Sequence, residues 1–488
     1  MYFLIPASAA VIVLVLTTIV RTRRKLKDKG LPPGPKPLPL MGNLYQVDPA
    51  HPWITFAEWK RYGDPVYCQM FGRDVVVVNS ERVAQDLFEK RSRNYSDRMS
   101  MPNMLEPYGL AFDTAALNHD TVWRGHRRVF QQTLRPETIV AYEATQFRCA
   151  ANLLKDMRIT PESWWKHIRK YSAAVIMGAM YDHELPMKPE EDITFRTMVE
   201  GADLIFIIAS AGMIALLTAL PFLRYVPAWC PGGRWLNAEN SLRRMNALIN
   251  TPFNTLKKRI ASGEAGPCMM SEAFAKFEDM SKLEDAERII KDACGTAYIG
   301  EYIPTGSTLI VFTLAMILYP VVQKRAQEEI ESVVGVDRLH EFSDKPLLPY
   351  TEALVRETLR WRPVVPLAIS HAATSDDIYE GYSIPEVGAA VIPNIWAMTR
   401  DPEKYPRPDT FDPGRFLDAN GHLTKDTCEI SFGFGRRICP GRHFARASVW
   451  IAIAQILASF TIEKAKDASG NPITPAPEWA TGITSQVF

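Results

Sequence analysis

Long stretches of this chain repeat hydrophobic residues with the spacing of an α-helix, beginning near Val83. The clearest predicted helices are residues 126–155, 164–181, 240–262, 286–318, 320–334, 348–361 and 440–460. Strand-like runs are short and lie at residues 66–71, 75–79 and 389–393. Because no repeat or low-complexity tract appears, we expect a mainly α-helical fold with a small β portion, built as a single large domain.

One predicted helix contains an unusual segment, GEYIPTGST, at residues 300–308. Its proline, Pro304, removes one backbone hydrogen bond and clashes with the carbonyl of Gly300, at a cost of about 3 kcal/mol in an ordinary helix. The segment therefore marks either a local defect or a position where a helix distortion has a function.

The N-terminus carries an uncharged apolar run, residues 4–20, followed directly by the basic sequence RTRRKLKDK. A signal peptide has its positive charge before the apolar core, so this order favours a transmembrane anchor at residues 1–20, with the signal peptide as the alternative. The positive-inside rule predicts that the rest of the chain faces the cytosol. Residues 21–44 form a basic and proline-rich linker, and residues 45–488 form the folded domain.

A second apolar region covers residues 201–233, and residues 204–220 within it carry no charge. Glycine, serine and threonine dilute this run, and Pro221 and Pro227 close it. We expect a helix and loop that cover an apolar pocket or dip into a membrane surface, and a second membrane span is the alternative.

Charge and cysteine content narrow the function classes. The 56 basic and 55 acidic residues give a net charge of +1, so no electrostatic argument favours nucleic acid as a partner. The seven cysteines form neither a CxxC pair nor a zinc-type cluster, which is typical of reduced thiols in the cytosol. With 47% hydrophobic residues, the chain fits an apolar small-molecule partner better than it fits a nucleic acid.

The segment SFGFGRRICPGRH, residues 431–443, places Cys439 between two glycines and ahead of a predicted helix. Glycines allow a tight turn and close approach of the backbone to a flat ligand. Amide groups near a helix N-terminus, together with arginines, stabilise a thiolate. Such a thiolate can be the axial ligand of a haem iron.

This segment resembles the haem-binding motif of the cytochrome P-450 family, and the match is carried by Phe432, Gly435, Arg437, Cys439 and Gly441. Two other segments resemble family motifs in the expected order. They are ETLR at residues 357–360 and PDTFDPGRF at residues 408–416. The resemblance implies that Glu357, Arg360 and Arg415 form a buried ion-pair network beside the haem.

Further residues match positions that contact the haem propionates in the family. Trp123 and Arg127 fit its WxxxR helix, His371 falls where the family carries a histidine or arginine, and Arg437 completes the set. They would neutralise two carboxylates through charge-assisted hydrogen bonds.

The resemblance is closest to fungal microsomal members and implies a heme cofactor with an axial thiolate and Cys439 as the metal ligand. It also implies O2, an apolar substrate and NADPH-cytochrome P-450 reductase as partners. We expect a monomer that is anchored in the endoplasmic reticulum membrane by a single span.

The sequence departs from the family at the oxygen-binding helix. Ile303 and Pro304 stand where the family usually has an acid and a threonine that relay protons. Glu301 and Thr305 are four residues apart and share a helical face, so they are the candidate catalytic acid and alcohol. Glu301 nevertheless lies about 200° around the helix from position 303.

Three functions therefore remain open: a monooxygenase, a peroxide-dependent or hydroperoxide-rearranging haem enzyme, and a weakly active or degenerate haem-binding protein. Family members usually run on beyond the last residues of this chain, TGITSQVF, and either a truncated C-terminal end or the degenerate protein would explain this difference. The residues expected near the pocket are mainly apolar, which favours a terpenoid, steroid or polycyclic aromatic substrate. They lie at 99–112, at the start of 204–220, and at 299–305, 364–367 and 481–483.

Overall fold

The computed structural model describes residues 30–39, 41–70, 72–98, 105–186, 188–210, 213–214, 216–217, 220–277, 286–385, 389–475, 479–480 and 486–487. The predicted anchor, residues 1–20, lies outside these described residues. The chain divides into two compact units. The sheet unit comprises residues 1–101, 366–401 and 433–438, and the helical unit comprises residues 102–365, 402–432 and 439–488.

The sheet unit is built on a four-stranded sheet in the order β1-β2-β6-β3. Its strands are β1 (Val66–Met70), β2 (Arg73–Val78), β3 (His371–Ala372) and β6 (Ala390–Pro393), with a separate β4 (Asp377–Tyr379) and β5 (Tyr382–Ile384) pair. β1 and β2 are antiparallel, whereas β2 and β6 are parallel. The helices of this unit are α2 (Pro52–Glu58), α3 (Glu81–Gln85) and α17 (Ile395–Met398). Phe56 and Trp59 pack on Val66, Val75 and Val77 of β1 and β2, and the continuous run of buried valines in β2 shows that both faces of this strand are covered.

The helical unit contains most of the α-helices, and β7 (Trp479–Ala480) pairs with β8 (Gln486–Val487) at its C-terminal end. Its helices are α5 (Thr121–Thr133), α6 (Pro136–Ile139), α7 (Glu143–Ile159), α8 (Trp164–Tyr181), α9 (Ile193–Ile208), α11 (Gly233–Leu236), α12 (Ala238–Ala261), α13 (Met269–Phe277), α14 (Ala286–Leu318), α15 (Pro320–Val334), α16 (Pro349–Trp361) and α18 (Arg442–Ser459). The prediction of a mainly helical protein with a small β portion is confirmed.

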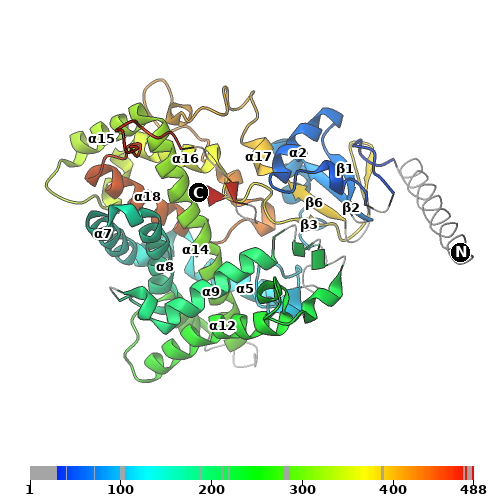
Figure 1. Cartoon of the computed structure of the whole chain (residues 1–488), viewed down its shortest axis with the longest axis horizontal. Coiled ribbons are helices and arrows are strands. Elements are labelled where there is room, and N and C mark those ends of the chain that lie inside the picture. The colour runs from blue at the N-terminus through cyan, green and yellow to red at the C-terminus, as the bar shows by residue number, and fades with distance from the viewer. Residues whose placement is uncertain are drawn as a thin grey trace, which may run out of the picture. The chain divides into compact units, whose positions relative to one another are not determined.

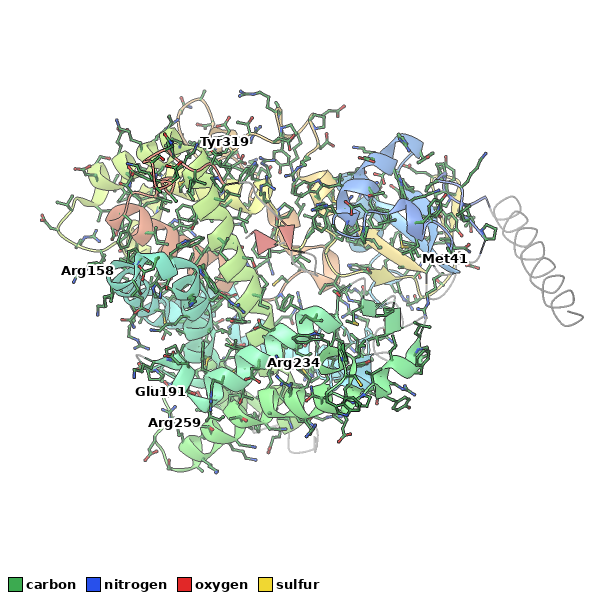
Figure 2. The ribbon with its side chains drawn as sticks, viewed as in Figure 1. Met41, Arg158, Glu191, Arg234, Arg259 and Tyr319 are labelled. Atoms are coloured by element: carbon green, nitrogen blue, oxygen red, sulfur yellow. The ribbon has the colours of Figure 1, made fainter. Side chains whose placement is uncertain are left out.

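The core of the helical unit is a bundle of α7, α8, α14 and α18 (Figure 1). α14 continues through Pro304, so the proline does not end this helix. It ends at Leu318, where Tyr319, labelled in Figure 2, places its ring 5.9 Å from that of Trp361 and 5.8 Å from that of Phe411. These ring contacts connect the end of the bundle to α16, through Trp361, and to the segment that contains Phe411.

Three predicted helices, α8, α14 and α15, have the bounds that the hydrophobic pattern predicts. The predicted helix at residues 126–155 is wrong, because the structure has α5, α6 and α7 there. Arg135 is extended ahead of Pro136, which occupies the first turn of α6. A residue before proline avoids the helical region, so the chain must break at this point.

One helix in the described ranges, α14, is long and apolar enough to cross a membrane, but 78% of its apolar window is buried inside the protein. In the second apolar region, α9 ends at Ile208, and its residues Leu204, Ile205 and Ile208 are buried. The described part of residues 204–220 therefore favours the helix and loop over the second membrane span.

Candidate active site

Cys439 lies three residues before α18, in the electropositive region of this helix N-terminus. Its backbone N–H donates to the carbonyl of Phe432 at 2.9 Å, which closes the loop on itself. Burial raises the pKa of the Cys439 thiol, whereas the Gly441 N–H and the guanidinium groups of Arg127 and Arg442 favour the thiolate. Coordination to a metal would complete the deprotonation.

Of the two glycines of the motif, Gly435 is required by close approach, whereas Gly441 has room for a Cβ. A Cβ at Gly435 would collide with the carbonyl oxygen of Phe88 within the sheet unit, and Gly435 has φ +55°. A Cβ at Gly441 would lie 4.0 Å from the sulfur of Cys439. Only glycine avoids both the collision and the conformational strain at position 435.

Trp123 and Arg127 lie one turn apart on α5 in the helical unit. Asp120 caps this helix, accepting the Trp123 N–H at 2.8 Å, and Trp123 is buried. Burial lowers the pKa of Arg127, while the negative charge of the Cys439 thiolate opposes that shift. Arg127 is thus within electrostatic reach of the predicted iron ligand, Cys439, in the same unit.

His371 and Arg437 lie in the sheet unit together with Arg98. The ring of His371 donates from Nδ1 to the carbonyl of Tyr95 at 2.7 Å, and Arg437 Nε donates to the carbonyl of Ser96 at 2.7 Å. Burial lowers the pKa of His371 far below its usual value, and both arginines add to this. The ring is therefore neutral in a cationic cluster.

Arg98 is a member of this cluster that the sequence did not reveal. It is buried, and its Nη1 donates to the carbonyls of Ile369 and Ser370 at 2.7 and 3.0 Å. The adjacent Asp97 pairs with Ala372 of β3, which brings residue 98 beside His371. No spacing rule connects residues so far apart, so only the strand pairing could have found this arginine.

The middle of α14 has an open strip on a largely buried surface, whereas Glu287 and Arg288 are exposed near the start of the helix. Gly300 is exposed, and no atom of the described residues lies within 4 Å of where its Cβ would be. Thr296 and Pro304, one turn before and after it, are partly exposed. A glycine in such a strip leaves room for a flat group against the helix backbone. Within the helical unit, the Cys439 thiol, the Arg127 guanidinium and this strip fit a haem.

Glu301 and Thr305 form the hydrogen bond that their spacing predicts. Thr305 Oγ1 donates to Glu301 Oε1 at 2.8 Å, and the two residues are only 5% and 2% exposed. Burial raises the pKa of Glu301 to about 7, although hydrogen bonds from Thr305 and Ser448 oppose the shift. Ser448 lies on α18, so Glu301 contacts the core of the bundle.

Ser172 of α8 supports the same stretch of α14. Its hydroxyl lies 2.6 Å from the carbonyl of Tyr302 and 3.2 Å from that of Glu301. Ile303, at the position of the usual acid, is 5% exposed and offers no proton. Glu301 and Thr305 are thus buried next to α8 and α18.

The predicted ion-pair network is present in the helical unit. Arg360 donates to both carboxylate oxygens of Glu357, at 2.6 and 2.8 Å, and neither side chain is exposed. Arg415 Nε lies 3.4 Å from the same carboxylate, which also accepts the Asp412 N–H at 2.8 Å.

All seven cysteines lie in the described ranges, and each is a free thiol outside any disulfide, as expected.

Comparison with known proteins decides the family. The cytochrome P450 family profile matches residues 32–485. The chain belongs to the cytochrome P450 family. Cytochrome P450 monooxygenase 176 of Postia placenta is 37% identical over 492 residues, which span 99% of this chain and 93% of that relative. Cytochrome P450 monooxygenase COX1 of Coprinopsis cinerea is 34% identical over 96% of this chain and 92% of its own length.

A third relative, tryptamine 4-monooxygenase of Psilocybe cyanescens, is 32% identical over 94% of this chain and 92% of its own length. As a cytochrome P450, the protein is an oxidoreductase of the monooxygenase class, with haem held by a cysteine thiolate as its cofactor. The family also uses O2 and a redox partner.

Proposed function

We propose that this cytochrome P450 oxidises an apolar small molecule with O2, using electrons from NADPH-cytochrome P450 reductase, and that Cys439 is the iron ligand. The main support is the helical unit, where Cys439 precedes α18, Arg127 acts on its charge, and Gly300 opens one strip of α14. Bound haem would supply O2 binding and activation, which protein side chains lack.

The remaining site residues bind and position the cofactor. Trp123 and Arg127 would hold one propionate from α5, and His371 with Arg437 would hold the other, joined by Arg98. Neutral His371 already donates its single N–H to the Tyr95 carbonyl, so it would line the site while Arg437 and Arg98 supply the charge and the hydrogen bonds. Phe432 fixes the Cys439 amide, while Gly435 and Gly441 keep side-chain bulk away from the loop.

Substrate chemistry follows from the apolar side chains of α14 and the loop before α5. Ile299, Ile303 and Phe112 are buried apolar residues of these elements. They favour a neutral terpenoid, steroid or polycyclic aromatic, because binding to such groups scales with buried apolar area.

Proton delivery is assigned to Glu301 and Thr305, whose hydrogen bond links a carboxyl group with a pKa of about 7 to an alcohol. A group with this pKa can donate a proton near neutral pH.

A second function is supported by one observation. Glu301 and Thr305 are buried beside α8 and α18, whereas the open strip of α14 carries Gly300 and Pro304. An enzyme that acts on a hydroperoxide needs no proton relay at that strip. Peroxide-dependent oxygenation, or rearrangement of a hydroperoxide, is therefore the alternative, and a weakly active haem-binding protein is the third.

For location, we propose a monomer anchored by residues 1–20 in the endoplasmic reticulum membrane, with the catalytic part in the cytosol. Phe222, Tyr225 and Trp229 are 64%, 69% and 85% exposed in the second apolar region. Exposed aromatic side chains of this kind are typical of membrane-surface contact, which supports the expectation for that loop.

Reduced holoprotein with carbon monoxide should show an absorption band at about 450 nm, and Cys439→Ala should abolish it. Product that requires both NADPH and reductase supports the monooxygenase, and product from a hydroperoxide alone supports the alternative. If Cys439→Ala kept both haem and band, the assignment of the iron ligand would be wrong.

A further inference from the structure

α16 carries a second buried carboxylate five residues before Glu357. Glu352 is 4% exposed and lies among three cations of the helical unit. Its Oε1 accepts from Arg446 Nη2 at 2.9 Å and from Arg356 Nε at 3.2 Å. Its Oε2 lies 3.3 Å from Lys345 Nζ. Five residues turn a helix by about 500°, so Glu352 and Glu357 serve different sides of α16.

The two arginines reach past Glu352 to the same piece of backbone. Arg356 Nη1 donates to the carbonyls of Thr424 and Asp426, each at 2.9 Å. Arg446 Nη1 donates to the carbonyl of Thr427 at 3.0 Å. One carboxylate therefore orients two guanidinium groups that together hold three carbonyls.

Residues 424–427 are connected by hydrogen bonds and a short helical turn to the loop that carries Cys439, the proposed iron ligand. The Asp426 carboxylate accepts the Cys428 N–H at 2.9 Å and the Tyr405 hydroxyl at 2.8 Å. A 3-10 turn follows at Glu429–Phe432, and the carbonyl of Phe432 accepts the Cys439 N–H. On the other side of the ligand, Arg446 is itself a residue of α18, the helix that follows Cys439. Glu352, Lys345, Arg356 and Arg446 form the Glu352 cluster. This cluster thus holds the backbone on both sides of the loop that carries Cys439, the ligand loop.

We propose that Glu352 is a positioning residue for the Cys439 thiolate, acting through Arg356 and Arg446. This inference rests on the proposed function of Cys439. The buried ion pairs around Glu357 brace residues 406–412, whereas the Glu352 cluster braces residues 424–427 and α18. Without the Glu352 charge, the buried guanidinium of Arg356, the partly buried guanidinium of Arg446 and Lys345 lose their shared counter-ion and repel one another.

The test uses holoprotein with Glu352→Gln, which keeps size and removes charge. We expect the carbon monoxide band at about 450 nm to decay roughly tenfold faster in urea too dilute to change the far-ultraviolet circular dichroism. Arg446→Met, which keeps the stem and removes the guanidinium, should give the same result, and Glu352→Asp should restore part of the lifetime. The matched control is Glu328→Gln on α15, whose carboxylate is 64% exposed and lies 3.7 Å from Lys324.

A purely structural role predicts a different outcome. The band would then be lost only together with helical structure, at a lower urea concentration, in both the Glu352 and Arg446 variants. That result would overturn the inference. If Glu352→Gln fails to fold, Arg446→Met decides the question alone. A wild-type chain that binds haem without the band would instead refute Cys439 ligation, so the two failures are distinguishable.

Discussion

At the scale of single residues, Glu301 links the chemistry of α14 to the stability of the bundle. Its carboxyl group has an ordinary pKa of 4.5 and a folded-state pKa of about 7, caused by burial. A raised folded-state pKa contributes stability that is fully present below pH 4.5 and is lost as the pH rises through 7. A shift of this size corresponds to about 3 kcal/mol.

Glu301→Gln should therefore remove a pH dependence. Between pH 4.5 and pH 8, the wild-type free energy of unfolding should fall by about 3 kcal/mol relative to the variant. Denaturant unfolding at several pH values measures this difference. Thr305→Val, which deletes the hydrogen bond that favours the carboxylate, should make the fall steeper. A difference that does not change with pH would show that Glu301 is not held protonated.

Gly435 offers a residue-scale test of the ligand loop. Gly435→Ala introduces a collision with the Phe88 carbonyl in addition to a left-handed backbone strain of about 1 kcal/mol. Gly421→Ala is the matched control, because Gly421 has φ +82° and no atom of the described chain within 4 Å of its Cβ position. We expect haem retention after gel filtration to fall for Gly435→Ala alone. Equal losses in both variants would assign the whole effect to backbone strain.

At the scale of elements, α16 braces residues 406–412 through the buried Glu357 network. Glu357→Gln leaves Arg360 and Arg415 without their buried counter-charge, so the free energy of unfolding should fall by about 3–5 kcal/mol. Glu191→Gln should change it by less than about 0.5 kcal/mol, because its pair with Lys188 is 3.3 Å long and largely exposed. Urea unfolding monitored by circular dichroism compares the two. If both variants lost a similar free energy of unfolding, the buried Glu357 network would not stabilise the protein as expected.

The elements also show what the sequence can and cannot predict. The apolar periodicity of α14 predicts its bounds because almost every face of that helix is buried. The break between α5 and α7 was missed, although Pro136 was a visible signal. Cys439, Glu357 and Arg360 were predictable from short local motifs. Arg98 was not, since a long-range strand bridge places it.

Like Arg98, the Glu352 cluster could not be predicted from the sequence. Its four charged residues lie on α16, on α18 and just before α16, and no short motif joins them. In the sequence, Glu352 and Arg356 are an ordinary i,i+4 pair of the sort that stabilises exposed helices. Burial turns this pair into a brace, and burial is a property of the folded unit.

At the scale of the whole molecule, the proposed monooxygenase reaction would take electrons from a partner and protons from the protein. α14 lacks the usual acid and alcohol at positions 303 and 304 and holds Glu301 and Thr305 in the bundle instead. If these two residues deliver protons, coupling of NADPH to product should fall as the pH rises through 7, where Glu301 loses its proton. Product per NADPH consumed measures this, and a profile unchanged by Glu301→Gln would remove Glu301 from the relay.

Restoring the usual pair tests whether its absence limits the enzyme. Ile303→Asp with Pro304→Thr places a carboxyl group and a hydroxyl group at those positions, and the new backbone N–H can bond to the Gly300 carbonyl. Because Ile303 is 5% exposed, the new carboxyl is desolvated and its pKa rises toward neutrality, as a proton donor requires. We expect more product and less hydrogen peroxide per NADPH with the reductase present. Ile303→Asn with Pro304→Thr is the matched control, since it has the same shape without the acid. Equal coupling in both variants and the wild type would show that the missing pair is not limiting, and hydroperoxide-driven turnover would then become the better account.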